Sequence, residues 1–360
     1  MHSEIARQRL SNQRIAGAKP ERVSDLVKWM GMIQAQDYLG ALWAVGSRLQ
    51  SASEGDIEKA LSEKQIVRTW PARGTLHFVA AQDVRWLLEL LAQRMIARSQ
   101  GRYRQLGLDE ATFSLSKDVF IRALQGGFSL KRSEMLQVLE TAHISTAGQR
   151  GIHILGRLAQ EGLICFGPRA GKQQTFVLLD EWAPQAQSMP RDEALVELTR
   201  RYFTSHGPAT LQDFTWWSGL TAADARAGLE LAGMRLVQER FGDQTYWFSE
   251  AASISEEPSP SAHLLPAFDE YLVGYKDRSA VLQPKFVKQT NAGGGMLSPI
   301  VVIDGQVLGT WKRTLKKAAV IIETRWFTEV NPGQVDAFRK AALQYGAFLN
   351  LPVDLIEAYD

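Results

Sequence analysis

One order of elements recurs along this chain: helical segments, then two short apolar strands joined by a tight turn. Residues 54–79 show it first, residues 132–179 show it again, and residues 191–248 show it a third time. In each stretch, apolar residues at helical spacing give way to two runs that suit strands, on either side of a turn that contains glycine. Helices followed by a hairpin are the arrangement of a winged helix, and three tandem copies suit a curved array.

Capping residues predict where the helices of these stretches begin and end. Ser133 and Thr221 are suited to N-caps, because their hydroxyls can accept hydrogen bonds from the free N–H groups of a first turn. Gly162 and Gly233 are suited to helix ends, because glycine readily adopts the left-handed conformation that closes a helix.

The composition of the chain changes after the third stretch. Residues 250–262 are rich in Ser and Pro, acidic and without periodic apolar residues, which predicts a linker. Beyond it, Asp304-Gly305 between two apolar runs predicts a β-hairpin, and residues 335–349 predict a terminal helix. The predicted fold class is therefore α+β, with tandem winged-helix units and a C-terminal β-rich domain. The predicted parts are a first winged-helix unit (1–105), a second (106–182), a third (183–249), the linker (250–262) and the β-rich domain with its terminal helix (263–360).

The composition fits a globular chain without a membrane segment or a metal site. Of its 360 residues, 45% are apolar and 22% are charged. No apolar run approaches the roughly 18 residues of a membrane span, and residues 1–7 lack the apolar core of a signal peptide, so we expect a cytoplasmic protein. The single cysteine, Cys165, is expected to be a packed small residue. With six scattered histidines there is no metal cluster, and neither a metal nor another cofactor is expected.

The joint between two predicted helices carries two glutamines. Residues 20–33 predict an amphipathic helix, a second helix follows, and Gln34 and Gln36 lie between them on either side of Ala35. Residues two apart point to the same side only in an extended segment, so both amides can serve one site only if this joint is extended. The alternative is that both amides bind backbone groups at a helix junction. Asp37 is placed to cap the second helix.

Three segments, in order along the chain, resemble one known family. They are Gln34–Ala44, Val67–Val79 and Leu264–Ser279. Together they resemble the bacterial winged-helix alkylpurine DNA glycosylases of the AlkZ/AlkX (YcaQ-like) type, and they extend over most of the chain. The catalytic element of that family is Gln, a hydrophobic residue, then Gln or Asp. The resemblance therefore implies catalytic roles for Gln34 and Gln36, although Ala35 is smaller than the middle residue we would expect.

The basic residues are distributed unevenly. The net charge is only +2, but residues 1–105 hold 16 Lys and Arg against 10 Asp and Glu, which leaves 25 against 29 in the remainder. Basic side chains neutralise the phosphates of a duplex, so basic clusters in a chain of winged-helix pattern favour DNA contact over an ordinary solvated face. The residues expected to bind DNA are Arg68, Arg73, His77, Arg94, Arg98, Lys312 and Arg313. Arg73 lies at a turn, where it could enter a minor groove. His77 has an alternative role as a buried imidazole between two apolar neighbours.

A pair of amides suits a reaction whose leaving group is already activated. Glutamine has no proton that titrates near neutral pH, so it cannot serve as a general base. An N3- or N7-alkylated purine is cationic and leaves without being protonated. What is still needed is a water held beneath the sugar C1′ and oxygen dipoles that face the oxocarbenium-like centre, and two oriented amide carbonyls can supply both.

We therefore expect a monofunctional DNA glycosylase that acts, as a monomer, on double-stranded DNA containing cationic N3- or N7-alkylpurines. The resemblance extends this expectation to bulky adducts and interstrand crosslinks. The alternative is a non-catalytic winged-helix regulator or repair accessory protein, which would bind a defined sequence and leave alkylated DNA intact.

Several other side chains are candidates for the same site. Asp37 is the rival general base, because it adjoins the glutamines. The carboxylates of Asp269, Glu270 and Asp277 are expected to act as a hydrogen-bonding scaffold rather than as bases. The pair Trp216-Trp217 is expected to pack in the core rather than to stack on bases, because aromatic residues of helices usually pack.

Overall fold

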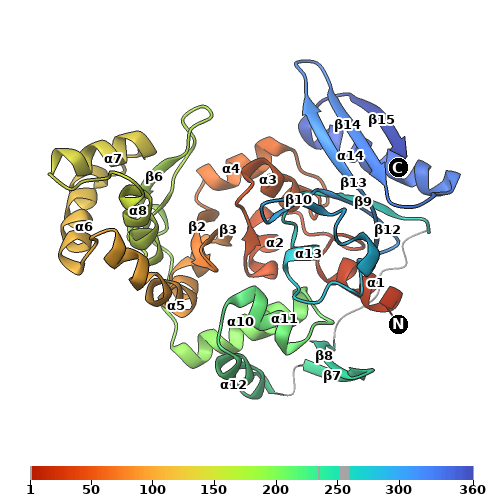
Figure 1. The fold of residues 1–360 in the computed structure, drawn as a ribbon, viewed down its shortest axis with the longest axis horizontal. Coiled ribbons are helices and arrows are strands. Elements are labelled where there is room, and N and C mark those ends of the chain that lie inside the picture. Colours follow the sequence, from red (N-terminus) through yellow and green to blue (C-terminus); the bar gives the residue numbers. More distant parts are fainter. Residues whose placement is uncertain (1, 234–235, 251–258, 360) are drawn as a thin grey trace. The chain divides into compact units, whose positions relative to one another are not determined.

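The chain forms two compact units in this structure, a computed structural model that describes residues 2–233, 236–250 and 259–359 (Figure 1). Unit 1 comprises Met1–Glu58, Val196–Trp217 and Thr221–Asp360, and unit 2 comprises Lys59–Leu195 and Ser218–Leu220. The boundary at Glu58 lies inside the predicted first winged-helix part, so the division into five parts stays a prediction. The predicted linker lies mostly outside the described residues.

Unit 1 combines helices with a five-stranded sheet. The strand order is β15 (Val353–Tyr359), β14 (Val320–Trp326), β13 (Gln306–Leu315), β12 (Ile300–Ile303) and β9 (Ala262–Leu265), and all neighbours are antiparallel except β14 and β15. The predicted hairpin at Asp304-Gly305 is confirmed: these residues join β12 to β13 with φ of 47° and 83°, values that suit a tight hairpin turn. The predicted terminal helix is confirmed as α14 (Pro332–Leu349), which packs on this sheet through a buried face (Figure 1).

The helices of unit 1 are α1 (His2–Asn12), α2 (Val23–Met30), α3 (Tyr38–Gly46), α12 (Ala222–Ala232), α13 (Glu270–Val273) and α14 (Pro332–Leu349). Three helices have residues in both units: α4 (Glu54–Ser62), α10 (Arg191–Ser205) and α11 (Leu211–Ser218), of which only Ser218 belongs to unit 2. Its strands are β1 (Ile33–Gln34), β7 (Leu236–Phe241), β8 (Gln244–Ser249), β9 (Ala262–Leu265), β10 (Asn291–Gly293), β11 (Met296–Leu297), β12 (Ile300–Ile303), β13 (Gln306–Leu315), β14 (Val320–Trp326) and β15 (Val353–Tyr359).

Unit 2 places a sheet among helices. Its strands have the order β3-β2-β5-β6-β4 and pair in antiparallel fashion. The predicted order of helices followed by a hairpin is present over residues 132–179, where α7 and α8 precede β5 and β6. The elements are β2 (Ile66–Ala72), β3 (Thr75–Ala80), α5 (Val84–Gln105), α6 (Glu110–Leu124), β4 (Leu130–Lys131), α7 (Arg132–Thr141), α8 (Arg150–Gln160), β5 (Ile164–Phe166), β6 (Thr175–Leu178) and α9 (Leu179–Trp182). Cys165 is buried, as expected.

The capping predictions divide into correct and incorrect ones. The Thr221 hydroxyl accepts a hydrogen bond from the Asp224 N–H at 3.0 Å, which confirms it as an N-cap. Ser133 is not a cap, because α7 already begins at Arg132 and Ser133 lies inside its first turn. Gly162 and Gly233 follow helix ends with positive φ, as predicted.

Candidate functional site

The joint that carries the two glutamines is extended at its start. α2 ends at Met30, and the next residue, Gly31, has a φ of 78°, which residues other than glycine rarely adopt. The chain then runs extended through Ile33 and Gln34 as β1, and Gln36 follows two residues later in a bend before α3. Gln34 is buried, with 9% of its surface exposed, whereas Gln36 is exposed. The local geometry thus meets the extended condition at Gln34, and one of the two amides is open to solvent.

Asp37 occupies the N-cap position of α3, but its side chain makes no capping hydrogen bond. The predicted capping bond is therefore wrong, although the position is right. Its carboxylate lies close to Gly40 instead, because a Cβ added to Gly40 would be 2.5 Å from Asp37 Oδ2. A glycine at position 40 is what leaves room for this carboxylate beside the glutamine segment.

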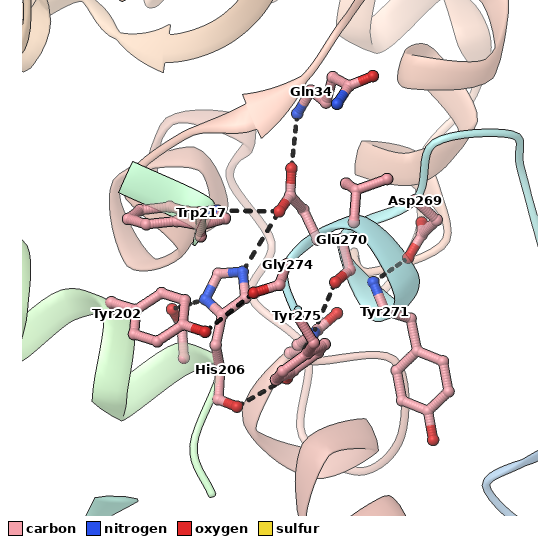
Figure 2. Close-up of polar contacts among 12 residues, drawn as sticks. Gln34, Tyr202, His206, Trp217, Asp269, Glu270, Tyr271, Gly274 and Tyr275 are labelled. Carbon is pink, nitrogen blue, oxygen red and sulfur yellow. Dashed lines mark hydrogen bonds and ion pairs between the residues drawn. The ribbon is translucent and has the colours of Figure 1, made fainter. Parts of the chain in front are cut away.

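The buried carboxylate of Glu270 holds the main chain of the glutamine segment (Figure 2). Its Oε1 accepts a hydrogen bond from the Gln34 N–H at 2.8 Å, and its Oε2 accepts one from the Trp217 indole N–H at 3.0 Å. Glu270 has no exposed surface. In Figure 2 the side chain of Gln34 runs away from Glu270, so the carboxylate fixes the backbone and leaves the amide directed elsewhere.

The neighbouring carboxylate, Asp269, is clamped by a buried arginine. Arg48 donates to both of its oxygens, at 2.8 and 2.7 Å, and both side chains are about 1% exposed. Asp269 also accepts from the Tyr271 N–H at 2.9 Å, which caps α13. Asp277 accepts from the Ser279 N–H at 2.9 Å. All three carboxylates therefore make the hydrogen bonds of a scaffold, as the sequence predicts.

His206 completes the buried polar cluster beside Glu270. Its Nε2 lies 3.5 Å from Glu270 Oε2, and its Nδ1 lies 2.8 Å from the Ser205 hydroxyl. Burial lowers the pKa of His206 below its usual value, although the Glu270 carboxylate acts in the opposite direction. Serine, histidine and glutamate in a row resemble a hydrolytic triad, but all three side chains are fully buried. Because no substrate can reach them, this row is part of the fold.

The two tryptophans of α11 differ in their surroundings. Trp217 is fully buried, which confirms the expectation for it. Trp216 is 43% exposed, so the expectation of core packing is wrong at this position. Its indole N–H donates to the Val273 carbonyl at 3.2 Å, and Lys276 Nζ lies 4.9 Å from the centre of its ring.

The hairpin of β2 and β3 presents Arg73 at its tip. Arg73 and Gly74 form the two-residue turn, with φ of 55° and 71°. Positive φ is unfavourable for an arginine, so this conformation is imposed by the hairpin. The Arg73 guanidinium lies 3.3 Å from His77 Nε2, while His77 Nδ1 lies 3.0 Å from the Thr75 carbonyl. A carbonyl only accepts, so Nδ1 carries the hydrogen and Nε2 accepts from Arg73. His77, which is fully buried, thus orients Arg73.

The basic residues of α5 lie on one helical face. Arg94 and Arg98 are exposed and four residues apart, which places them on neighbouring turns. Arg94 donates to the Gly219 carbonyl, and Arg73 Cγ is 3.6 Å from where a Cβ of Gly219 would be. The structure therefore brings Arg73 and Arg94 to the same glycine. Arg68 is different: it is 5% exposed and lies over the ring of Phe166 at 4.9 Å.

The two basic candidates of β13 point to opposite faces of the sheet, as adjacent residues of a strand do. Lys312 is exposed, and its Nζ lies 2.8 Å from Glu323 of the paired strand. Arg313 is half-buried, and it donates to the hydroxyl of Tyr345 of α14. The sequence suggested one cluster, but only Lys312 of this pair faces solvent fully.

Sequence reasoning did not find how Glu270, Trp217 and His206 support Gln34. The signals were available separately, because Glu270 lies in one of the three segments singled out and Trp217 in a helix. Nothing in their spacing shows that they meet, since Glu270 is 236 residues from Gln34.

Among the described residues, no helix is both long and apolar enough to cross a membrane. The described part of the chain also has no group of three or more His, Cys, Asp or Glu side chains placed to hold a metal ion.

Comparison with known proteins identifies the family. A family model described as "DNA glycosylase AlkZ-like" matches residues 27–348 of the chain. The chain belongs to the AlkZ-like DNA glycosylase family. A curated relative, the "Interstrand DNA cross-link repair glycosylase" of Streptomyces sahachiroi, is 26% identical over 324 residues, which cover 84% of this chain and 85% of that protein.

The solved structure of Streptomyces sahachiroi DNA glycosylase AlkZ has the same α+β fold. The two superpose with a TM-score of 0.81 at 24% identity, and the match covers 98% of this chain and 99% of that one. The resemblance that the three sequence segments carried is therefore confirmed. Membership of the AlkZ-like family makes this chain a DNA glycosylase, an enzyme of DNA repair.

Proposed function

We propose that this AlkZ-like enzyme is a monofunctional glycosylase that hydrolyses the N-glycosidic bond of cationic N3- and N7-alkylpurines in double-stranded DNA. Gln34 and Gln36 hold the attacking water and direct their carbonyl dipoles at the oxocarbenium-like sugar. The alkylated base leaves as a neutral molecule, so neither amide has to protonate it, and the water that bonds to C1′ releases its proton to solvent. No metal or other cofactor takes part.

The observation that carries the proposal is the geometry of the joint. Gln34 is fixed through its backbone by a buried carboxylate, and its side-chain amide is directed away from that carboxylate. Gln36 is exposed two residues later. An oriented dipole costs no reorganisation at the moment of reaction, so a fixed backbone beside an accessible amide is the arrangement that this chemistry needs.

The proposed DNA contacts are the basic residues that can reach phosphates. Arg73 at the hairpin tip, Arg94 and Arg98 on α5 and Lys312 on β13 are accessible in full or in part. Arg68, His77 and Arg313 are more enclosed, and each contacts a neighbour: Arg68 lies over the Phe166 ring, His77 accepts from Arg73, and Arg313 donates to Tyr345. The enzyme binds DNA as a monomer, through its tandem winged-helix units.

The proposal is tested by incubating the enzyme with a duplex that contains one 7-methylguanine and then heating it or adding alkali to cut abasic sites. We expect cleavage at the lesion, and no cleavage of the matched duplex that contains guanine. Intact alkylated DNA, together with tight binding to one defined sequence, would support a regulator instead.

The proposed substrate range includes bulky adducts. The Streptomyces sahachiroi relative is named for interstrand cross-link repair. We propose that this enzyme likewise accepts adducts too large for a closed base pocket, because Gln36 is exposed rather than enclosed. We expect excision rates for 7-methylguanine and for a much larger N7 adduct within about tenfold of each other, or ~1.4 kcal/mol. An enzyme that removes the methylated base and ignores the large adduct would contradict this range.

A further inference from the structure

We propose that Glu270 is a positioning residue for the reaction, and that it acts through Gln34. This inference rests on the proposed function. It adds that the position of the Gln34 side-chain amide is set by a carboxylate on α13, which is distant from Gln34 in the sequence.

The geometry around Glu270 is that of a two-point support. One oxygen accepts from the Gln34 N–H at 2.8 Å, and the other accepts from the Trp217 indole at 3.0 Å. Both donors are buried, so these hydrogen bonds are screened little by water. The carboxylate thus joins the glutamine segment to α11, whose Trp217 packs among aromatic rings 4.9 to 6.5 Å away between centres.

Only a carboxylate satisfies both neighbours. The main-chain N–H of Gln34 and the indole N–H of Trp217 are both donors, so each needs an acceptor. A glutamine at position 270 has nearly the same shape but only one acceptor oxygen, and its NH₂ group would face one of the two donors. A buried donor that loses its acceptor is costly, so the glutamine segment would shift to find another.

The helix that carries Glu270 is itself held in place. It is the first residue of α13, and the preceding Asp269 is gripped by Arg48 at 2.7 and 2.8 Å. At the other end of α13, the Gly274 carbonyl accepts a hydrogen bond from the Tyr202 hydroxyl at 2.9 Å. The side chain that contacts Gln34 therefore projects from a short helix fixed at both ends.

The effect on the reaction follows from how steeply catalysis depends on placement. A displacement of about 1 Å at a catalytic group can cost on the order of 10²-fold in rate. Glu270 lies on the backbone side of Gln34 and contacts the main chain, so its loss should change the rate of the chemical step and leave DNA affinity nearly unchanged. A residue that served only the stability of the fold would not show this division.

The test is a double-mutant cycle of Glu270→Gln with Gln34→Ala, measured as single-turnover excision of 7-methylguanine. We expect Glu270→Gln to lower the excision rate by roughly 10- to 100-fold, with the dissociation constant for DNA within about twofold of the wild type. In the Gln34→Ala background the same change should cost less than about twofold, because the group it positions is gone. In the Gln36→Ala background it should keep most of its effect.

Equal effects of Glu270→Gln with and without Gln34 would overturn the positioning role while leaving the proposed function intact. A wild-type enzyme that cannot release 7-methylguanine would instead overturn the proposed function, and this inference with it. If Glu270→Gln fails to fold, Trp217→Phe serves in the same cycle, because it removes the indole donor and keeps most of the packing. Trp217→Phe should lower the rate several-fold, and this effect too should vanish in the Gln34→Ala background.

Discussion

Two regions of this protein are suited to a charged ligand in different ways. One is the surroundings of Gln34, and the other is the set of arginines on the β2–β3 hairpin and α5. Around Gln34, the supporting groups are fully buried, and each contact has a short, fixed distance. Around Arg73, Arg94 and Arg98, the side chains are exposed or partly exposed, and their charges reach into solvent. The first region holds a catalytic side chain in position, and the second supplies positive charge to the surface.

The difference predicts how each region responds to change. Exposed charges act over distances limited by the Debye length, so their contribution depends on salt. A buried hydrogen bond is shielded from ions, so the contribution of Gln34 and its support should not depend on salt. Two experiments test this contrast and a third tests the buried cluster alone, from the largest expected effect to the smallest.

Removing either catalytic amide should have the largest effect. We expect Gln34→Ala and Gln36→Ala each to lower the single-turnover excision rate by about 10²-fold, equivalent to ~2.7 kcal/mol for one oriented dipole. The loss should be the same at low and at high salt. Gln137→Ala, which changes an exposed glutamine of α7, is the matched control and should leave the rate unchanged. Full activity of the double variant would disprove the central role of the pair.

Reversing the charge at the hairpin tip should have a smaller effect that depends on salt. We expect Arg73→Glu to weaken duplex binding about tenfold at low salt and to reduce the slope of log K against log salt by about one unit. Arg122→Glu makes the same charge change at an exposed position of α6 and should have little effect. Fluorescence anisotropy over a series of salt concentrations gives both numbers. A loss of duplex affinity that does not depend on salt would mean that Arg73 contributes through a fixed contact, as the glutamines do, and not through its charge.

The smallest expected effect concerns His206 and pH. Its pKa is lowered by burial, against the pull of Glu270 and with smaller contributions from Arg48 and Arg9. Below the ordinary histidine pKa of about 6.5, the unfolded chain therefore binds a proton that the folded protein does not, so stability is lost as the pH falls from 6.5 toward the lowered value.

Urea denaturation at pH 7.5 and 5.5 measures this loss. The His206→Gln variant should show a smaller difference between the two pH values than the wild type. His153, whose pKa is also lowered by burial, is present in both proteins and cancels from the comparison. An equal pH dependence in the two proteins would show that His206 contributes nothing to it.

Much of the fold could be predicted from the sequence, because its elements carry local signals. The Asp304-Gly305 hairpin and the helices α7, α8 and α14 follow from turn chemistry and apolar periodicity near the predicted limits. The errors are local too: Ser133 lies within α7, because the helix starts earlier than its most obvious capping residue. The long helix α5 and the parallel strand β15 were not predicted, and β15 depends on a partner strand rather than on a local signal.

The candidate site was only partly predictable, for a different reason. Gln34 and Gln36 were found from their place between two helices and from the resemblance. Their support was not, because no periodicity relates Glu270 or Trp217 to Gln34. Lys312 and Arg313 show the opposite error, in which neighbours in sequence are assigned to one cluster although a strand turns them to opposite faces.

The separation of 236 positions between Gln34 and its acceptor Glu270 also bears on how the protein is made. A growing chain contains both glutamines before it contains the carboxylate, which follows only after tens of seconds at a synthesis rate of about 5–20 residues per second. During that interval the glutamine segment is without the group that fixes it. The organised segment can therefore form only after Glu270 has been translated, and a synthesis interrupted between the two positions would yield fragments that carry the motif without its support.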